Sequence, residues 1–275
     1  MAVMVVTDSS ARLPEELLAT NGIRVVPLHI LVDGIDLRDG VDQIPADIHD
    51  RHASTAGATP AELCAAYERA LAASGGDGVL GVHLSAELSS TFSAAEEAAR
   101  QLGDGVAVVD SRSAAMGTGF IALAAARAAA GGADLQTVLS VARAAVDRTH
   151  AYIVVQRLDN LRRSGRLGGP AAWLGTALSL KPLLRVDNGK LVLAQRVRTA
   201  SKAVSTMLDQ VQSVVGDRSA AIAVHHVADP EGAAGLAEVL ERRLPACSPV
   251  IVTDLGPVLA LHVGAGALAV AVLEE

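Results

Sequence analysis

Residues 78–92 read GVLGVHLSAELSSTF, and this stretch decides the fold. Residues 78–84 form a short apolar run that begins at a glycine, which is typical of a buried strand. The hydroxyl-rich loop 85–90 follows, and a helical pattern then continues to Leu102 and Gly103. Strand, polar loop and helix therefore follow one another within 25 residues, which is the order expected around a parallel sheet.

The same order recurs through the first half of the chain. The pattern predicts strands at 3–6, 23–32, 78–84, 106–109 and 152–155, and helices at 14–19, 59–74, 91–102, 114–130 and from 134 onward. Thr59, Pro60 and Glu62 form a capping box with proline at the first helical position, and Asp33-Gly34 predicts a tight turn. The expected fold is α/β, with a mostly parallel sheet that has helices on both faces.

The second half has a different pattern. Asp187-Asn188-Gly189-Lys190 stands between two apolar runs and predicts a hairpin. Helices are expected from Ala200 and from Asp229-Pro230, and strands at 220–224, 250–253 and 268–273. This mixture predicts a smaller α+β domain. We place the boundary at residue 157, which gives domains 1–157 and 158–275 with a ligand cleft between them.

Composition excludes several classes of protein. The 275 residues are 51% hydrophobic but only 2% aromatic, and the net charge is −7, so neither base stacking nor phosphate-backbone binding is expected. Two cysteines without a CxxC motif, and a short apolar N-terminus that predicts a first strand, favour a reducing cytoplasm. The apolar stretches 114–133 and 258–273 contain Arg127 and His262, and neither predicts stable membrane insertion.

Short polar side chains follow several of the predicted strands, at 7–10, 85–91, 110–111 and 253–254. Each could be a helix N-cap, but the carboxyl ends of parallel strands share one edge, where ligands bind. The loop 85–90 precedes a helix start, whose free N–H groups favour an anion such as a carboxylate or phosphate.

Other groupings give weaker predictions. Ser89, His262 and Asp8 could form a hydrolase triad, but the chain has no GxSxG pattern. His49 and His52 could bind a metal but more simply belong to a surface helix. Arg162, Arg163 and Arg166 cluster before Gly168, and guanidinium groups suit phosphate or an acidic partner, although a solvated face is the simpler interpretation of the cluster taken alone. The chain has no Walker loop, so it should hold no nucleotide, and we expect no metal, no cofactor and no catalytic residue of its own.

The sequence resembles the DegV family through motifs that occur in the same order along the whole chain. The family motifs TDS, LSSxLSGTY, SGRI, GxLLxxKPxL, xDGK, xxRT and HxGxG are matched at residues 5–10, 84–92, 164–167, 173–186, 187–189, 196–199 and 262–266.

The resemblance implies a two-domain DegV-like fold that is similar to the fatty-acid-binding subunits of bacterial fatty acid kinase. In those proteins an acyl chain lies in an apolar tunnel between two domains, and a separate ATP-binding kinase subunit phosphorylates the carboxylate. When the family's site residues are matched one by one to this sequence, the resemblance implies that the carboxylate is held by Thr55, Ser89 and His262. It also implies that the kinase subunit or its phosphate is contacted by Arg166 and Arg198. The chain itself is then a lipid-binding subunit and no self-sufficient enzyme.

Two motifs depart from the family. TSQP is replaced by Thr55-Ala56-Gly57-Ala58, so that Ser54 would take the place of Thr55 if the register moved by one. LSGT is replaced by Leu88-Ser89-Ser90-Thr91, and Ser90 would be strained if that position required a positive φ. Two alternatives therefore stay open: an acyl hydrolase or transferase that uses Ser89 and His262, and a carrier of another apolar anion.

Overall fold

A computed structural model describes residues 2–168, 181–247 and 249–275. Its first sheet has four parallel strands in the order β2-β1-β6-β7. The strands are β1 (Met4–Asp8), β2 (Arg24–Val26), β6 (Val79–His83) and β7 (Val106–Asp110). All five residues of β6 are buried, as expected for the central strand of a parallel sheet with both faces covered.

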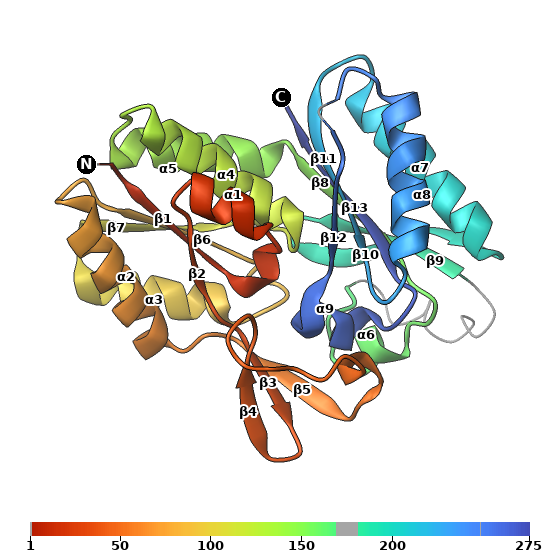
Figure 1. Cartoon of the computed structure of the whole chain (residues 1–275), viewed down its shortest axis with the longest axis horizontal. Coiled ribbons are helices and arrows are strands. Elements are labelled where there is room, and N and C mark those ends of the chain that lie inside the picture. The colour runs from red at the N-terminus through yellow and green to blue at the C-terminus, as the bar shows by residue number, and fades with distance from the viewer. Residues whose placement is uncertain (1, 169–180, 248) are drawn as a thin grey trace.

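Helices cover both faces of this sheet, which confirms the α/β prediction (Figure 1). They are α1 (Glu15–Thr20), α2 (Pro60–Ser74), α3 (Thr91–Leu102), α4 (Met116–Ala130) and α5 (Leu135–Asp147). The expected capping box at Thr59 and Glu62 begins α2. Helix α4 packs against both β1 and the second sheet, which explains why the apolar stretch around Phe120 is buried on all sides.

A three-stranded antiparallel sheet, in the order β4-β3-β5, projects below the first sheet in Figure 1. Its strands are β3 (His29–Val32), β4 (Ile35–Arg38) and β5 (Ala53–Ala56). The prediction of one strand over 23–32 was wrong, because β2 ends before Pro27, which has no N–H to donate to a strand partner. Asp33 and Gly34 have positive φ and form the expected turn.

His29 ties this small sheet to the start of α2. Its Nδ1 lies 2.9 Å from Asp36 on β4, and its Nε2 lies 3.1 Å from Glu62 in the first turn of α2. Burial lowers the pKa of His29, but the hydrogen bonds and charges of both carboxylates outweigh that effect, and the pKa is raised overall.

The second sheet has six strands in the order β10-β9-β8-β13-β11-β12. They are β8 (Thr149–Val154), β9 (Lys181–Asp187), β10 (Lys190–Val197), β11 (Ala220–His226), β12 (Ile251–Asp254) and β13 (Leu268–Glu274). All neighbours are antiparallel except β11 and β12. The predicted hairpin joins β9 to β10 through Asn188 and Gly189, both of which have positive φ.

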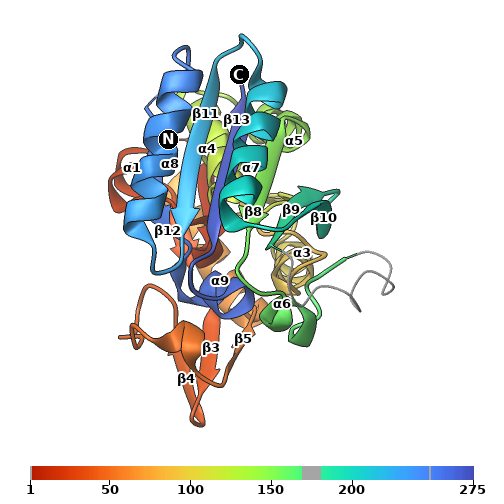
Figure 2. The same cartoon turned by 90° about the vertical axis from the view of Figure 1, so that its right-hand side faces the viewer.

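Helices α7 (Ala200–Val215) and α8 (Pro230–Arg243) cover the outer face of this sheet, and Figure 2 shows α4 on the opposite side. The chain changes sheet before residue 157, at which the charged composition placed the domain boundary. β8 already pairs with β13 and β9, so the chain crosses to the second sheet between Asp147 and Thr149.

Two short helices lie between the second sheet and the small one: α6 (Asp159–Arg163) and α9 (Gly256–Val263). The 3₁₀ turn η1 (Ser9–Ala11) leads to Arg12, whose Nη2 lies 2.7 Å from Asp254 just before α9. Gly256 has a φ of +71°, and a Cβ there would lie 2.5 Å from the Arg12 guanidinium, so this contact requires glycine.

His49 lies on the 3₁₀ turn η2 (Ile48–Asp50) and not on the helix that the sequence suggested, and His52 follows the turn. Within the described ranges, no three His, Cys, Asp or Glu side chains gather as a metal site. The same residues include no helix that is both long and apolar enough to span a bilayer.

Candidate functional site

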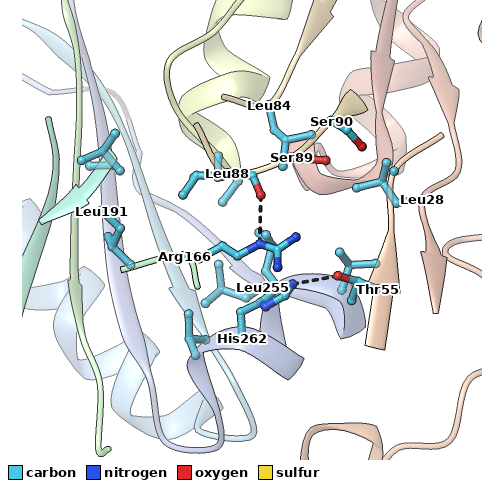
Figure 3. A pocket seen from close by; sticks show the side chains of 18 of the residues that line it. Leu28, Thr55, Leu84, Leu88, Ser89, Ser90, Arg166, Leu191, Leu255 and His262 are labelled. Carbon is cyan, nitrogen blue, oxygen red and sulfur yellow. Dashed lines mark hydrogen bonds between the residues drawn. The ribbon is translucent and has the colours of Figure 1, made fainter. Parts of the chain in front are cut away.

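A cavity of about 730 Å³ lies between the first and second sheets, within the size range of small-molecule sites. Most of its lining is apolar and comes from all parts of the chain (Figure 3). The leucine and isoleucine residues of the lining are Leu28, Leu84, Leu88, Ile153, Leu161, Leu191, Leu255 and Leu259. Such a cavity suits an aliphatic ligand more than a polar or aromatic one.

Small side chains line the part of the cavity next to α4 and the second sheet. Ala114 and Ala115 precede α4, and Ala151, Ala269 and Ala271 lie on β8 and β13. Each alanine leaves space that a larger side chain would fill. This run of alanines therefore leaves room for a ligand between α4 and the sheet.

One histidine lies among these small residues. His225 on β11 is fully buried, and its Nε2 accepts a hydrogen bond from the Met116 N–H at 3.2 Å. Burial, with a smaller contribution from Arg12, lowers its pKa to about 3. The ring is therefore neutral at pH 7, and its proton is on Nδ1. This histidine caps the start of α4 and adds no charge to the cavity.

Thr55 and His262 meet at one end of the cavity. The Thr55 hydroxyl on β5 lies 2.8 Å from Nε2 of His262 on α9 (Figure 3). Burial, with a smaller effect from the Arg166 charge, lowers the pKa of His262 to about 4, so the ring is neutral at pH 7. These two groups can hydrogen-bond a ligand head group without forming a salt bridge to it. Thr55, and not Ser54, makes this contact: Ser54 is exposed and lines only a neighbouring groove.

Ser89 and Ser90 line the same cavity from the loop between β6 and α3. The Ser89 hydroxyl lies 2.9 Å from that of Thr91 and accepts from the Thr91 N–H at 3.2 Å. Ser90 has a φ of −75°, so the glycine-to-serine departure causes no backbone strain. The loop after β5 reaches this helix start at Gly57, where a Cβ would lie 2.7 Å from the Thr91 hydroxyl.

Arg166 also lines the cavity, next to His262. Its Nε donates to the Leu88 carbonyl at 3.1 Å (Figure 3). Its Nη1 donates to the Ser164 carbonyl. The second predicted arginine, Arg198, is exposed before α7 and lines neither this cavity nor the neighbouring groove. The structure thus brings together Thr55, Ser89, Ser90, Arg166 and His262, but not Arg198.

Asp8 does not complete a triad with His262. It accepts hydrogen bonds from Ser10, from the Leu84 N–H, and from Nδ1 of His83 at 3.1 Å, and it is fully buried. The Tyr67 hydroxyl lies 2.7 Å from Nε2 of the same His83. Sequence reasoning missed this buried Asp8–His83–Tyr67 chain, although His83 ends the strand that precedes the hydroxyl-rich loop.

These features define a class: a two-sheet α/β protein with an apolar ligand cavity whose end is lined by uncharged hydrogen-bonding groups. A family model described as "Uncharacterised protein, DegV family" matches residues 2–275. The chain belongs to the DegV family. Residues 173–180, which belong to one motif of the resemblance, lie outside the described residues. Of the other six motifs, three contribute residues to the cavity lining: 84–92, 164–167 and 262–266.

Similar proteins span the whole chain. A DegV domain-containing protein of Mycobacterium tuberculosis is 66% identical over 272 residues, which are 99% of this chain and 97% of that protein. A structure described as fatty acid binding of a DegV family protein from Thermus thermophilus has 32% identity and a TM-score of 0.93, with 100% of both chains covered. The structure of DegV, a fatty acid binding protein from Bacillus subtilis, has 29% identity and a TM-score of 0.90, again over 100% of both chains.

Proposed function

We propose that this protein binds a long-chain fatty acid in the apolar cavity and presents its carboxylate to a separate kinase subunit. The observation that carries the proposal is the Thr55–His262 pair, which places two uncharged polar groups at the end of an apolar cavity of about 730 Å³. The fatty-acid-binding proteins of Thermus thermophilus and Bacillus subtilis, which share the fold over their whole length, support the ligand class.

The energetics of the cavity fit an acyl chain. Each CH₂ group that leaves water contributes roughly 0.8 kcal/mol, so a long chain binds tightly with few polar contacts. The carboxylate then needs only orientation, which Thr55, Ser89 and the neutral His262 can provide through hydrogen bonds. Arg166 adds a nearby positive charge, but two of its donors already bond to backbone carbonyls, which limits how strongly it can hold the head group.

A carboxylate held in this way stays nucleophilic. In the proposed reaction one of its oxygens attacks the γ-phosphorus of ATP bound by the kinase subunit. A new P–O bond forms, the bond from the γ-phosphorus to the bridging oxygen of ADP breaks, and acyl phosphate and ADP are the products. The sequence has no nucleotide-binding loop, which supports a separate source of ATP. Because the proposed reaction uses ATP, we propose that it takes place in the cytoplasm.

Two measurements test this function. Native mass spectrometry of protein purified from a bacterial host should detect a bound molecule of fatty-acid mass. The loaded protein, incubated with a kinase subunit from the same organism and ATP, should give an acyl hydroxamate when hydroxylamine is added. A protein that carries no lipid and takes up none would contradict binding, whereas a loaded protein that is never phosphorylated would contradict presentation alone.

A further inference from the structure

One short segment, residues 8–12, reaches all three elements that carry the predicted head-group residues. Thr55 lies on the small sheet, Ser89 lies on the loop after β6, and His262 lies on α9. The segment follows β1 and contains η1, and none of its residues lines the cavity. Residues 8 and 9 belong to the TDS motif, to which fatty acid binding as described so far gives no role.

Asp8 fixes the start of the loop that carries Ser89. Its Oδ2 accepts from the Leu84 N–H at 3.0 Å and from Nδ1 of His83 at 3.1 Å, and its Oδ1 accepts from the N–H and the hydroxyl of Ser10. Because the carboxylate is fully buried, water does not compete for these bonds. The same side chain therefore fixes both the end of β6 and the direction in which η1 leaves β1.

Ser9 fixes the entry to the small sheet. Its hydroxyl accepts from the Leu28 N–H at 3.1 Å, immediately before β3 begins. The residue after β4 is held as well, because the Asp39 N–H donates to the Leu28 carbonyl at 2.8 Å and the Asp39 carboxylate lies 3.9 Å from Nη1 of Arg12. Burial raises the pKa of Asp39, and the Arg12 charge opposes that rise. Since Thr55 is carried by the same sheet, its position depends on these contacts.

Arg12 fixes the start of α9. Its Nε donates to the Asp254 carbonyl at 3.2 Å and its Nη2 to the Asp254 carboxylate at 2.7 Å, and that carboxylate also accepts from the Gly256 N–H at 2.6 Å. Arg12 has a φ of +54°, which residues other than glycine seldom adopt and which persists only where surrounding contacts hold it. His262 lies in the last turn of the helix that is fixed in this way.

Three residues within a stretch of five thus hold three separate elements that meet at one end of the cavity. We propose that Asp8, Ser9 and Arg12 are positioning residues for the carboxylate of the bound fatty acid, which act by holding the three head-group residues at distances that one carboxylate can span. Such support matters because hydrogen bonds weaken steeply when donor and acceptor are displaced. The inference rests on the proposed binding of a fatty acid, and it gives a segment outside the cavity control over affinity.

Calorimetric titration of palmitic acid into the full-length protein, freed of lipid, tests the assignment. Arg12→Gln removes the planar fork that holds Asp254, and Ser9→Ala removes the acceptor of the Leu28 N–H. Each variant should lower the affinity by about tenfold, which corresponds to the loss of one or two hydrogen bonds at the head group. If Arg12→Gln does not fold, the result for Ser9→Ala decides.

The matched control is Arg148→Gln. Arg148 is also an arginine that donates to backbone carbonyls, those of Ala144 and Glu274, but it is exposed and lines no part of the cavity. Its replacement should keep the affinity for palmitic acid within about twofold of the wild-type value. The control therefore separates the loss of positioning from the loss of an arginine as such.

NMR titration of the histidine ring nitrogens, with the His262 signal identified by its absence in His262→Ala, reports directly on α9. The pKa of His262 should be about 4 in wild type and in Arg148→Gln. In Arg12→Gln it should rise toward the ordinary value of 6.5, because a helix start that is no longer held lets water reach the buried ring. A general loss of stability that left the site in place would not move this pKa.

Wild-type affinity in both Arg12→Gln and Ser9→Ala, or an equal loss of affinity in Arg148→Gln, would overturn the inference while leaving fatty acid binding intact. A wild-type protein that fails to bind palmitic acid would overturn the proposed function itself.

Discussion

The Thr55 hydroxyl and the Nε2 atom of His262 lie 2.8 Å apart, although 207 positions separate them in the chain. Neither partner comes from the parallel sheet that the sequence predicts most strongly. Thr55 is held by the small antiparallel sheet, where it pairs with the buried Ile30, and His262 is held by the helix that begins at Gly256. The head-group site therefore depends on how two separate elements are positioned.

Removal of either polar group should weaken fatty acid binding without unfolding the protein. Thr55→Val keeps the shape of the side chain but removes the hydroxyl, and His262→Ala removes the ring. We expect each to lower affinity for palmitic acid by about tenfold, equivalent to one or two hydrogen bonds. Titration of the purified variants measures the loss, and Ser54→Ala, which alters an exposed neighbour outside the cavity, serves as the control. Unchanged affinity in both variants would remove these residues from the site.

Gly256→Ala should disturb the site from a distance. The added Cβ would meet the Arg12 guanidinium at 2.5 Å at a position with φ of +71°, so the Arg12–Asp254 contact that precedes α9 must shift. We expect a loss of about 1–3 kcal/mol in the free energy of unfolding, measured with urea, together with weaker fatty acid binding.

Gly235→Ala provides the comparison for that variant. This glycine lies within α8, and nothing is within 4 Å of an added Cβ. Alanine is the better helix former, so the change should raise stability by about 0.5–1 kcal/mol. If the two glycine variants changed the free energy of unfolding by the same amount, the contact between Arg12 and Gly256 would not hold α9 in place.

The contacts of His29 with Asp36 and Glu62, which bridge β3, β4 and α2, predict that the stability of the protein depends on pH. The pKa of His29 in the folded protein is raised above the ordinary histidine value of 6.5, so the protonated ring stabilises the fold fully below pH 6.5. This contribution is lost as pH rises through the folded pKa. Wild type should therefore lose more stability than His29→Gln between pH 5.5 and 8.5. The difference should stay below about 1 kcal/mol, because Asp36 is half exposed.

Urea unfolding at both pH values measures this difference, and the remaining histidines, which both proteins share, cancel in the comparison. A larger loss of stability in the variant than in wild type would contradict the bridge between β3, β4 and α2.

The alanine-lined part of the cavity should set the length of the bound chain. Ala114→Leu places three further carbon atoms in space that the ligand otherwise occupies. Native mass spectrometry should then show shorter bound fatty acids than in wild type, while Ala72→Leu, on the exposed side of α2, should not change them. If the two variants carried the same bound fatty acids, the acyl chain would not occupy the space next to Ala114.

The sequence contained enough information for the local features. The capping box at Thr59, the turn at Asp33-Gly34 and the hairpin at Asn188-Gly189 depend on a few neighbouring residues, and all three occur as expected. The resemblance of the motifs to the DegV family also predicted Thr55, Ser89 and His262 as site residues, and all three line one cavity.

The features that the sequence did not reveal depend on distant pairing. The strand at 149–154 has the same apolar character whichever sheet it joins, and only its pairing with β13 places it in the second sheet. The contact of Arg166 with the Leu88 carbonyl joins positions 78 residues apart, and that of His83 with Asp8 joins positions 75 apart. No local pattern encodes either contact.

A crystal structure of the protein with bound palmitic acid tests the central claim most directly. It should show the acyl chain in the alanine- and leucine-lined cavity, with one carboxylate oxygen within hydrogen-bonding distance of both the Thr55 hydroxyl and Nε2 of His262. A carboxylate at the opposite end of the cavity, or a chain bound outside it, would contradict the account.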